Sequence, residues 1–141
     1  MDRTLCLNLL DQPGHKTIER FKQRVRELTD RNCGKSLYQV VKELNMYLRG
    51  WWNYFRLAEA RYILKALKTW IIRRLRCLVW KQWKNPRTKV QNLEKLGIDH
   101  AHAMTCGNTR KKHWRMSKVK WVAIAMPERY FIEKGLYLPG N

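Results

Sequence analysis

Acidic residues are scarce in this chain. Its 141 residues include 11 Asp and Glu against 30 Lys and Arg, so the formal net charge is +19 at pH 7. A domain this basic repels itself unless an acidic partner offsets the charge. Nucleic acid is the leading candidate, because its phosphates are dense and the counterions they release drive binding. An anionic membrane surface is the alternative, since positive charge alone does not decide between the two.

Long apolar runs are also missing. No segment approaches the roughly 18 uninterrupted apolar residues of a membrane span, because Lys and Arg interrupt even the most apolar stretch, 63–83. The N-terminus does not have the pattern of a secretory signal peptide. We therefore expect a cytoplasmic protein, in a bacterial cell or an organelle interior, with no membrane association. The four cysteines include no Cys-x-x-Cys pair and are expected to be free thiols.

The residue clusters of most enzyme active sites are absent as well. Polymerase chemistry needs grouped carboxylates that hold two magnesium ions, whereas the acids here are scattered and no Tyr-x-Asp-Asp motif occurs. A small metal-dependent nuclease is a competing hypothesis, with His100, His102, Cys106 and His113 as metal ligands. Their spacing, H-x-H-x3-C-x6-H, matches no common structural zinc site. We expect no catalysis by this chain alone, no cofactor and no metal.

Hydrophobic periodicity predicts an all-α protein. Apolar residues recur at three- and four-residue steps along much of the chain. Long helices are predicted at about 17–32, 36–55 and 58–83. Ser36 and Gln39 fit a capping box at the start of the second helix, and Pro86 is expected to end the third. Shorter helices are predicted at 88–96, 99–104, 119–125 and 127–134, with a basic loop at 107–113.

The predicted architecture is a three-helix bundle with a short helical C-terminal tail. Residues 1–16 are expected to be an N-terminal arm or linker, 17–87 the bundle, and 88–141 a small helical extension. The third helix should bury an apolar stripe formed by Ile63, Leu64, Leu67, Trp70, Ile71, Leu75 and Leu78. Trp51 and Trp52 are also expected in the core. Trp80 and Trp83 are compatible either with the core or with a surface that stacks on bases.

No acidic residue occurs between Ala60 and Leu93. Exposed helices usually interleave charges of both signs, because like charges at i, i+4 destabilise a helix. An external polyanion would remove that cost, and arginines interleaved with aromatics can grip phosphates and stack on unpaired bases. The predicted RNA-binding residues are Lys42, Arg49, Asn53, Arg56, Lys65, Lys68, Arg73, Arg74, Arg76, Trp80, Lys81, Trp83, Lys84, Arg87, Arg110, Lys111, Lys112 and Arg115.

Two ordered motifs resemble the maturase-specific domain of group II intron-encoded reverse transcriptases. The first is LRGWWNYF at residues 48–55, and the second is RRLRCLVWKQWK at residues 73–84. The likeness spans residues 17–138. It implies that 17–87 is a maturase or thumb bundle, a helical domain of a multidomain protein whose fingers and palm carry DNA synthesis.

What the resemblance implies about function is also specific. In this family the thumb contacts intron RNA, assists its folding for splicing and retrotransposition, and holds the template–primer duplex. The expected partners are therefore intron RNA or other structured RNA, an RNA/DNA template–primer, and reverse transcriptase fingers and palm in cis or in trans. A small metal-dependent nuclease and a basic membrane-surface protein remain the alternatives.

Overall fold

The computed structural model describes residues 14–30, 32, 34–57 and 61–138, and every regular element within them is an α-helix. The all-α prediction is confirmed. The long helices are α2 (His15–Leu28), α3 (Leu37–Leu57) and α4 (Arg61–Gln82). They are followed by α5 (Pro86–Lys95), α6 (His100–Gly107), α7 (His113–Met116), α8 (Lys120–Ala125) and α9 (Glu128–Glu133). No helix in this described part of the chain is long and apolar enough to cross a membrane.

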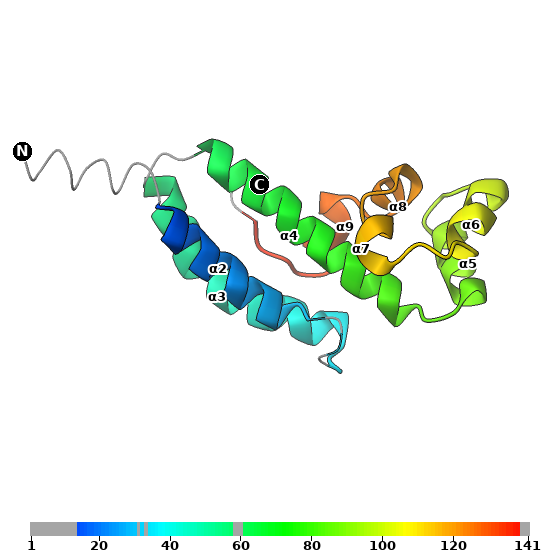
Figure 1. Ribbon diagram of the computed structural model, residues 1–141, viewed down its shortest axis with the longest axis horizontal. Coiled ribbons are helices and arrows are strands. Elements are labelled where there is room, and N and C mark those ends of the chain that lie inside the picture. Colours follow the sequence, from blue (N-terminus) through cyan, green and yellow to red (C-terminus); the bar gives the residue numbers. More distant parts are fainter. Residues whose placement is uncertain (1–13, 31, 33, 58–60, 139–141) are drawn as a thin grey trace, which may run out of the picture.

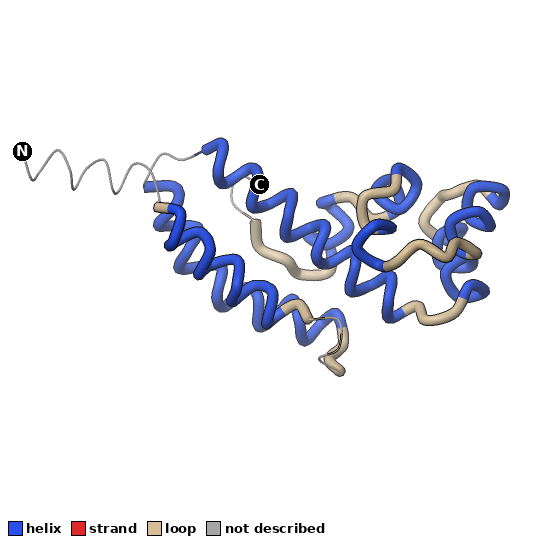
Figure 2. Tube along the Cα trace, viewed as in Figure 1, coloured by secondary structure: helices blue, strands red, loops and turns tan. Residues whose placement is uncertain are grey.

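The long helices form one end of the molecule and the short helices gather at the other (Figure 1). α2 packs along α3, and α3 packs on α4, which continues beyond both of them toward α5 and α7 (Figure 1). α7 packs on α4, and α5 and α6 lie beyond the C-terminal end of α4 (Figure 2). α4 therefore connects the two ends of the molecule.

Several helix boundaries follow the sequence signals, and others differ. The capping box is confirmed: the Ser36 backbone N–H donates to Gln39 Oε1 at 3.2 Å, and the Gln39 N–H donates to Ser36 Oγ at 3.3 Å. The first helix was expected to reach about residue 32, but it ends at Leu28. There the Thr29 hydroxyl and backbone N–H both donate to the Val25 carbonyl, which closes the last turn.

The boundary between α4 and α5 differs from the sequence prediction. α4 ends at Gln82, and Pro86 is the first residue of α5 rather than only a stop signal. Asn85 caps α5 by accepting a hydrogen bond from the Thr88 N–H at 2.9 Å, and a proline in the first turn needs no donor of its own. The sequence also missed α7, because four residues are too few for a periodic pattern.

The core is one continuous cluster that includes residues from α2 to the C-terminal segment. Leu67, Ile71, Leu75 and Leu78 of the predicted stripe are buried. Ile72, Val79 and Trp80 are buried too, on the side that carries the basic residues. α4 is therefore covered on nearly all sides over its C-terminal half.

The tryptophans divide between the core and its edge. Trp52 and Trp80 are buried, whereas Trp51, Trp70 and Trp83 are partly buried and pack against the core. The expectation that Trp70 is a central core residue needs correction. Its ring lies at the edge, where Lys22 Nζ and Arg26 Cζ each approach to 5.5 Å from its centroid.

The C-terminal segment returns to α3. Asn45 of α3 donates to the Gly135 carbonyl at 2.7 Å and accepts from the Tyr137 N–H at 2.8 Å. The indole N–H of Trp52 donates to the Tyr137 carbonyl at 3.1 Å. Leu136 and Leu138 are buried. The end of the predicted tail is thus fixed to α3, the second long helix. Residues 1–13 of the predicted arm lie outside the described residues. The proposed domain boundaries stay predictions.

Trp80→Ala tests the centre of the core. Trp80 has no exposed surface, and removing a buried tryptophan costs about 3–5 kcal/mol of unfolding free energy. Trp70→Ala should cost clearly less, because Trp70 lies at the core edge. Urea unfolding followed by circular dichroism measures both. Equal losses of stability in the two variants would contradict this assignment of the core.

Candidate nucleic-acid interface

The α4 arginines of the second motif point toward other parts of the protein. Arg73 Nε donates to Ser117 Oγ at 3.0 Å, and its Nη2 donates to the Trp114 carbonyl at 3.1 Å. The guanidinium carbon of Arg73 also lies 3.7 Å from the centroid of the Trp114 ring. Arg73 therefore joins α4 to α7 through both hydrogen bonds and a cation–π contact.

Arg74 and Arg76 make similar connections to other elements. Arg74 donates to Thr29 Oγ1 at 3.1 Å and to the Arg26 carbonyl at 3.2 Å, at the C-terminal end of α2. Arg76 Nε donates to the carbonyl of the buried Met126 at 2.7 Å, just after α8. Burial lowers the pKa of the Arg76 guanidinium. All three arginines are thus partly buried and bonded inside the fold.

Other predicted residues on or near α4 are also engaged within the protein. Lys68 Nζ lies 3.8 Å from a carboxylate oxygen of Glu128, and Lys81 contacts the side chain of Asn32. Trp80 has no exposed surface for a base, and its ring centroid lies 5.9 Å from that of the partly buried Trp83. Lys65, Lys84 and Arg87 are exposed.

The outer edge of α3 presents its predicted residues to solvent. Lys42, Arg49 and Arg56 recur every seven residues, which places them along one side of the helix. All three are exposed, as is Asn53, whose side-chain oxygen accepts a hydrogen bond from Arg56 Nη2 at 2.8 Å. Within the described part of the chain, none of the three cations forms an ion pair with a carboxylate. In the following text this set is called the α3 edge.

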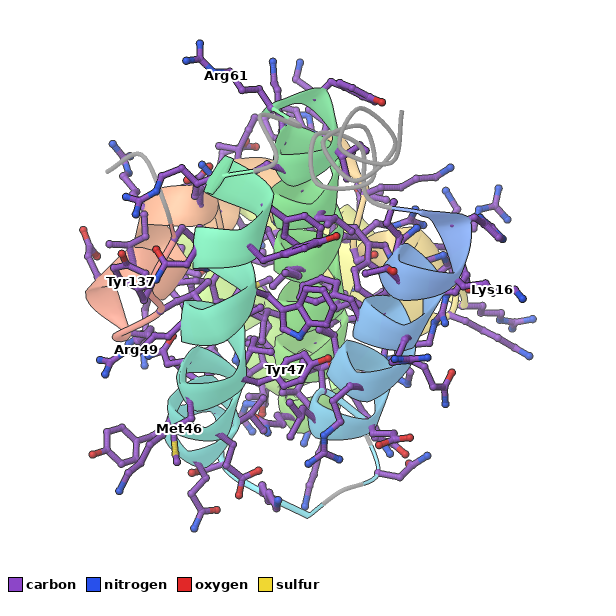
Figure 3. All side chains as sticks on the ribbon, turned by 90° about the vertical axis from the view of Figure 1, so that its left-hand side faces the viewer. Lys16, Met46, Tyr47, Arg49, Arg61 and Tyr137 are labelled. Atoms are coloured by element: carbon purple, nitrogen blue, oxygen red, sulfur yellow. The ribbon has the colours of Figure 1, made fainter. Side chains whose placement is uncertain are left out.

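A pocket of about 350 Å³ lies against the α3 edge. Arg49, Trp52, Asn53, Arg56 and Tyr137 line it, and no carboxylate is among them. Figure 3 shows Arg49 and Tyr137 on the same flank of the molecule, beside α3. Tyr137 was missed by the sequence reasoning, because the C-terminal segment carries no local signal that it returns to α3.

The predicted basic loop forms a second exposed group of cations. Arg110, Lys111, Lys112 and Arg115 all lie at the surface around the start of α7. No acidic residue occurs between Asp99 and Glu128. This group, called the tail loop below, belongs to the short-helix end of the molecule, whereas the α3 edge belongs to the long-helix end (Figure 1).

Three of the four residues of the metal hypothesis have other surroundings in the structure. His100 Nδ1 lies 2.5 Å from a Glu94 oxygen, and His102 Nδ1 lies 2.6 Å from an Asp99 oxygen. Cys106 is buried, and that burial raises the pKa of its thiol, which disfavours the thiolate that binds metals. Among the residues that the structure describes, no three His, Cys, Asp or Glu side chains come together to hold a metal ion.

The fold and surface define an all-helical, strongly basic domain whose exposed cations include the α3 edge and the tail loop. A family model for the group II intron maturase-specific domain matches residues 18–97, more than half of the chain. The chain belongs to this family, which confirms the resemblance seen in the motifs. No curated protein matches the chain with significant similarity.

Family membership supports a group II intron maturase role and implies an interaction with intron RNA in general. The maturase-specific domain is a non-catalytic part of intron-encoded reverse transcriptases. The matched segment runs from α2 to the end of α5 and includes the α3 edge. The tail loop and Tyr137 lie beyond it.

Arg76→Ala tests the internal role of the α4 arginines. The substitution leaves the Met126 carbonyl without its hydrogen-bond donor, and an unsatisfied buried polar group costs about 1–3 kcal/mol. Arg87→Ala is the matched control, because Arg87 is exposed on α5 and surface changes usually stay within about 0.5 kcal/mol. Thermal or urea unfolding measures both variants, and an Arg76→Ala protein as stable as wild type would exclude the internal role.

Proposed function

We propose that this chain binds structured group II intron RNA through the α3 edge and the tail loop. By holding that RNA it assists intron splicing and retrotransposition as the maturase, or thumb, part of a reverse transcriptase. The observation that supports this most directly is the exposure of these cations without a carboxylate partner among the described residues. Phosphates would supply the missing negative charge.

The chemistry of the α3 edge suits RNA. Arginine presents a planar fork that makes paired hydrogen bonds to phosphate, and two of the three cations are arginines. Asn53 lies between Arg49 and Arg56 and can reach sugar or base edges through its amide. A rigid helix holds these groups at fixed spacing, which lowers the entropy lost on binding.

The position of the two surfaces suggests how the domain acts. The α3 edge lies at the long-helix end of the molecule and the tail loop at the short-helix end (Figure 1). α4 connects these two ends, and its buried residues belong to the common core. Contacts at both would hold separate RNA segments, or an RNA and a template–primer duplex, at a set distance. DNA synthesis in this proposal belongs to fingers and palm supplied in cis or in trans.

Arg49→Ala combined with Arg56→Ala should weaken binding to a folded group II intron transcript by about ten-fold or more, which corresponds to about 1.4 kcal/mol. The control is Lys16→Ala combined with Arg20→Ala, which removes the same charge from two exposed positions on α2. Figure 3 shows Lys16 on the opposite flank of the bundle from Arg49. Fluorescence anisotropy at one salt concentration gives both affinities, and circular dichroism verifies the fold. Equal losses of RNA affinity in the two variants would show a non-specific effect of charge and would contradict a binding site at the α3 edge.

Binding should also depend steeply on salt. If about five of the exposed cations contact phosphates, log Kobs should fall by about four per tenfold increase in salt concentration, because each contact contributes about −0.7 to −0.9 to the slope. A titration series from low to physiological salt measures the slope. A value near zero would contradict an electrostatic interface.

A further inference from the structure

The pocket beside the α3 edge combines arginine side chains with an exposed aromatic ring. Tyr137 is 50% exposed and makes no ring pair with another aromatic residue in the described part of the chain. In contrast, the rings of Trp51 and Tyr54, on α3 itself, pack on each other at 5.6 Å. The Tyr137 ring therefore has surface to offer a ligand.

The backbone around this ring is fixed although the ring itself is exposed. The N–H of Tyr137 donates to Asn45 Oδ1 and its carbonyl accepts from Trp52 Nε1. The neighbouring Leu136 and Leu138 side chains are buried. None of these hydrogen bonds uses the phenol group, so the backbone holds the residue beside α3 while half of its surface stays exposed.

The other walls of the pocket favour an anion. Arg49 and Arg56 stand one on each side of Asn53 along α3, and the pocket has no carboxylate lining it. Its volume of about 350 Å³ falls at the lower end of the range of small-ligand sites, about 300–1,000 Å³. These groups match the parts of a nucleotide. An aromatic ring can stack on the base, two guanidinium groups can bind the phosphate, and an amide can reach the sugar or the edge of the base.

We propose that this pocket binds a single unpaired nucleotide of the RNA, with its base stacked on Tyr137 and its phosphate held by Arg49 and Arg56. The proposal rests on the proposed function and adds to it a preference for a bulge or a strand end over continuous duplex. Sequence-specific and structure-specific RNA recognition commonly uses such unstacked bases. The aromatic platform comes from the C-terminal segment, outside the residues matched by the family model.

The test compares two RNAs that differ by one nucleotide: a blunt RNA duplex, and the same duplex with one bulged adenosine. Wild-type protein should bind the bulged duplex more tightly by about five-fold or more, the contribution expected of one base on one aromatic ring. Tyr137→Ala should reduce that preference to about one while leaving the affinity for the blunt duplex unchanged. Tyr137→Phe should keep the preference, since the ring remains.

A double-mutant cycle separates stacking from a general effect on the surface. Replacing the bulged adenosine with an abasic nucleotide keeps its phosphate and removes its base. Wild-type protein should lose the preference with this RNA, and Tyr137→Ala should lose nothing further. Tyr62→Ala is the matched control, because Tyr62 is 70% exposed on α4 and lies outside the pocket. It should keep the full preference for the bulge.

The outcomes distinguish this inference from the proposed function. Equal binding of both duplexes by wild type, or a preference that survives Tyr137→Ala, would overturn the nucleotide pocket and leave the RNA-binding proposal standing. Failure of wild-type protein to bind either duplex or a folded intron transcript at low salt would overturn both. Quenching of 2-aminopurine at the bulge by wild type and Tyr137→Phe, but not by Tyr137→Ala, would directly support stacking.

Discussion

The fold depends on the hydrogen bonds that three arginines of α4 donate to backbone carbonyls of the elements around this helix. Arg74 reaches the end of α2, Arg73 reaches α7, and Arg76 reaches the turn after α8. Carbonyls at helix ends lack partners within their own helix and are costly to bury without a donor. Arginine suits this position because one guanidinium offers several donors in a plane and its stem packs among apolar side chains. A helix with cations on one side can therefore lie inside the protein.

This arrangement separates the arginines that serve the fold from cations that stay available at the surface. Arg73, Arg74 and Arg76 of α4 use donors within the fold, so they add to the net charge of +19 without forming an open phosphate-binding surface. The cations of the α3 edge and the tail loop remain exposed and have no ion pair with a described carboxylate. The net charge of a domain indicates an acidic partner, but the packing decides which residues are available to contact it.

The sequence predicted the helices well, because their apolar spacing is a local property. It also identified the family, whose motifs are contiguous stretches of α3 and α4. It could not predict that Arg73 and Arg76 turn inward, since a periodic pattern treats every arginine as solvent-facing and contains nothing about carbonyls that arrive from α7 and α8. Tyr137 was beyond reach for a similar reason. Its place beside Arg49 depends on hydrogen bonds of Asn45 and Trp52 to the backbone of a segment far along the chain, and a backbone donor or acceptor has no sequence signature.

Chemical modification of arginine by phenylglyoxal tests most directly whether the internal and the exposed arginines have different roles. The modified residues are mapped by mass spectrometry, with and without a folded group II intron transcript. The reagent modifies accessible guanidinium groups in the folded protein. Arg49 and Arg56 should react in the free protein and be protected by RNA, whereas Arg73, Arg74 and Arg76 should react slowly in both states because they are partly buried and bonded internally. Rapid modification of Arg73, Arg74 and Arg76 in the free protein, with protection by RNA there and none at Arg49 or Arg56, would contradict the account.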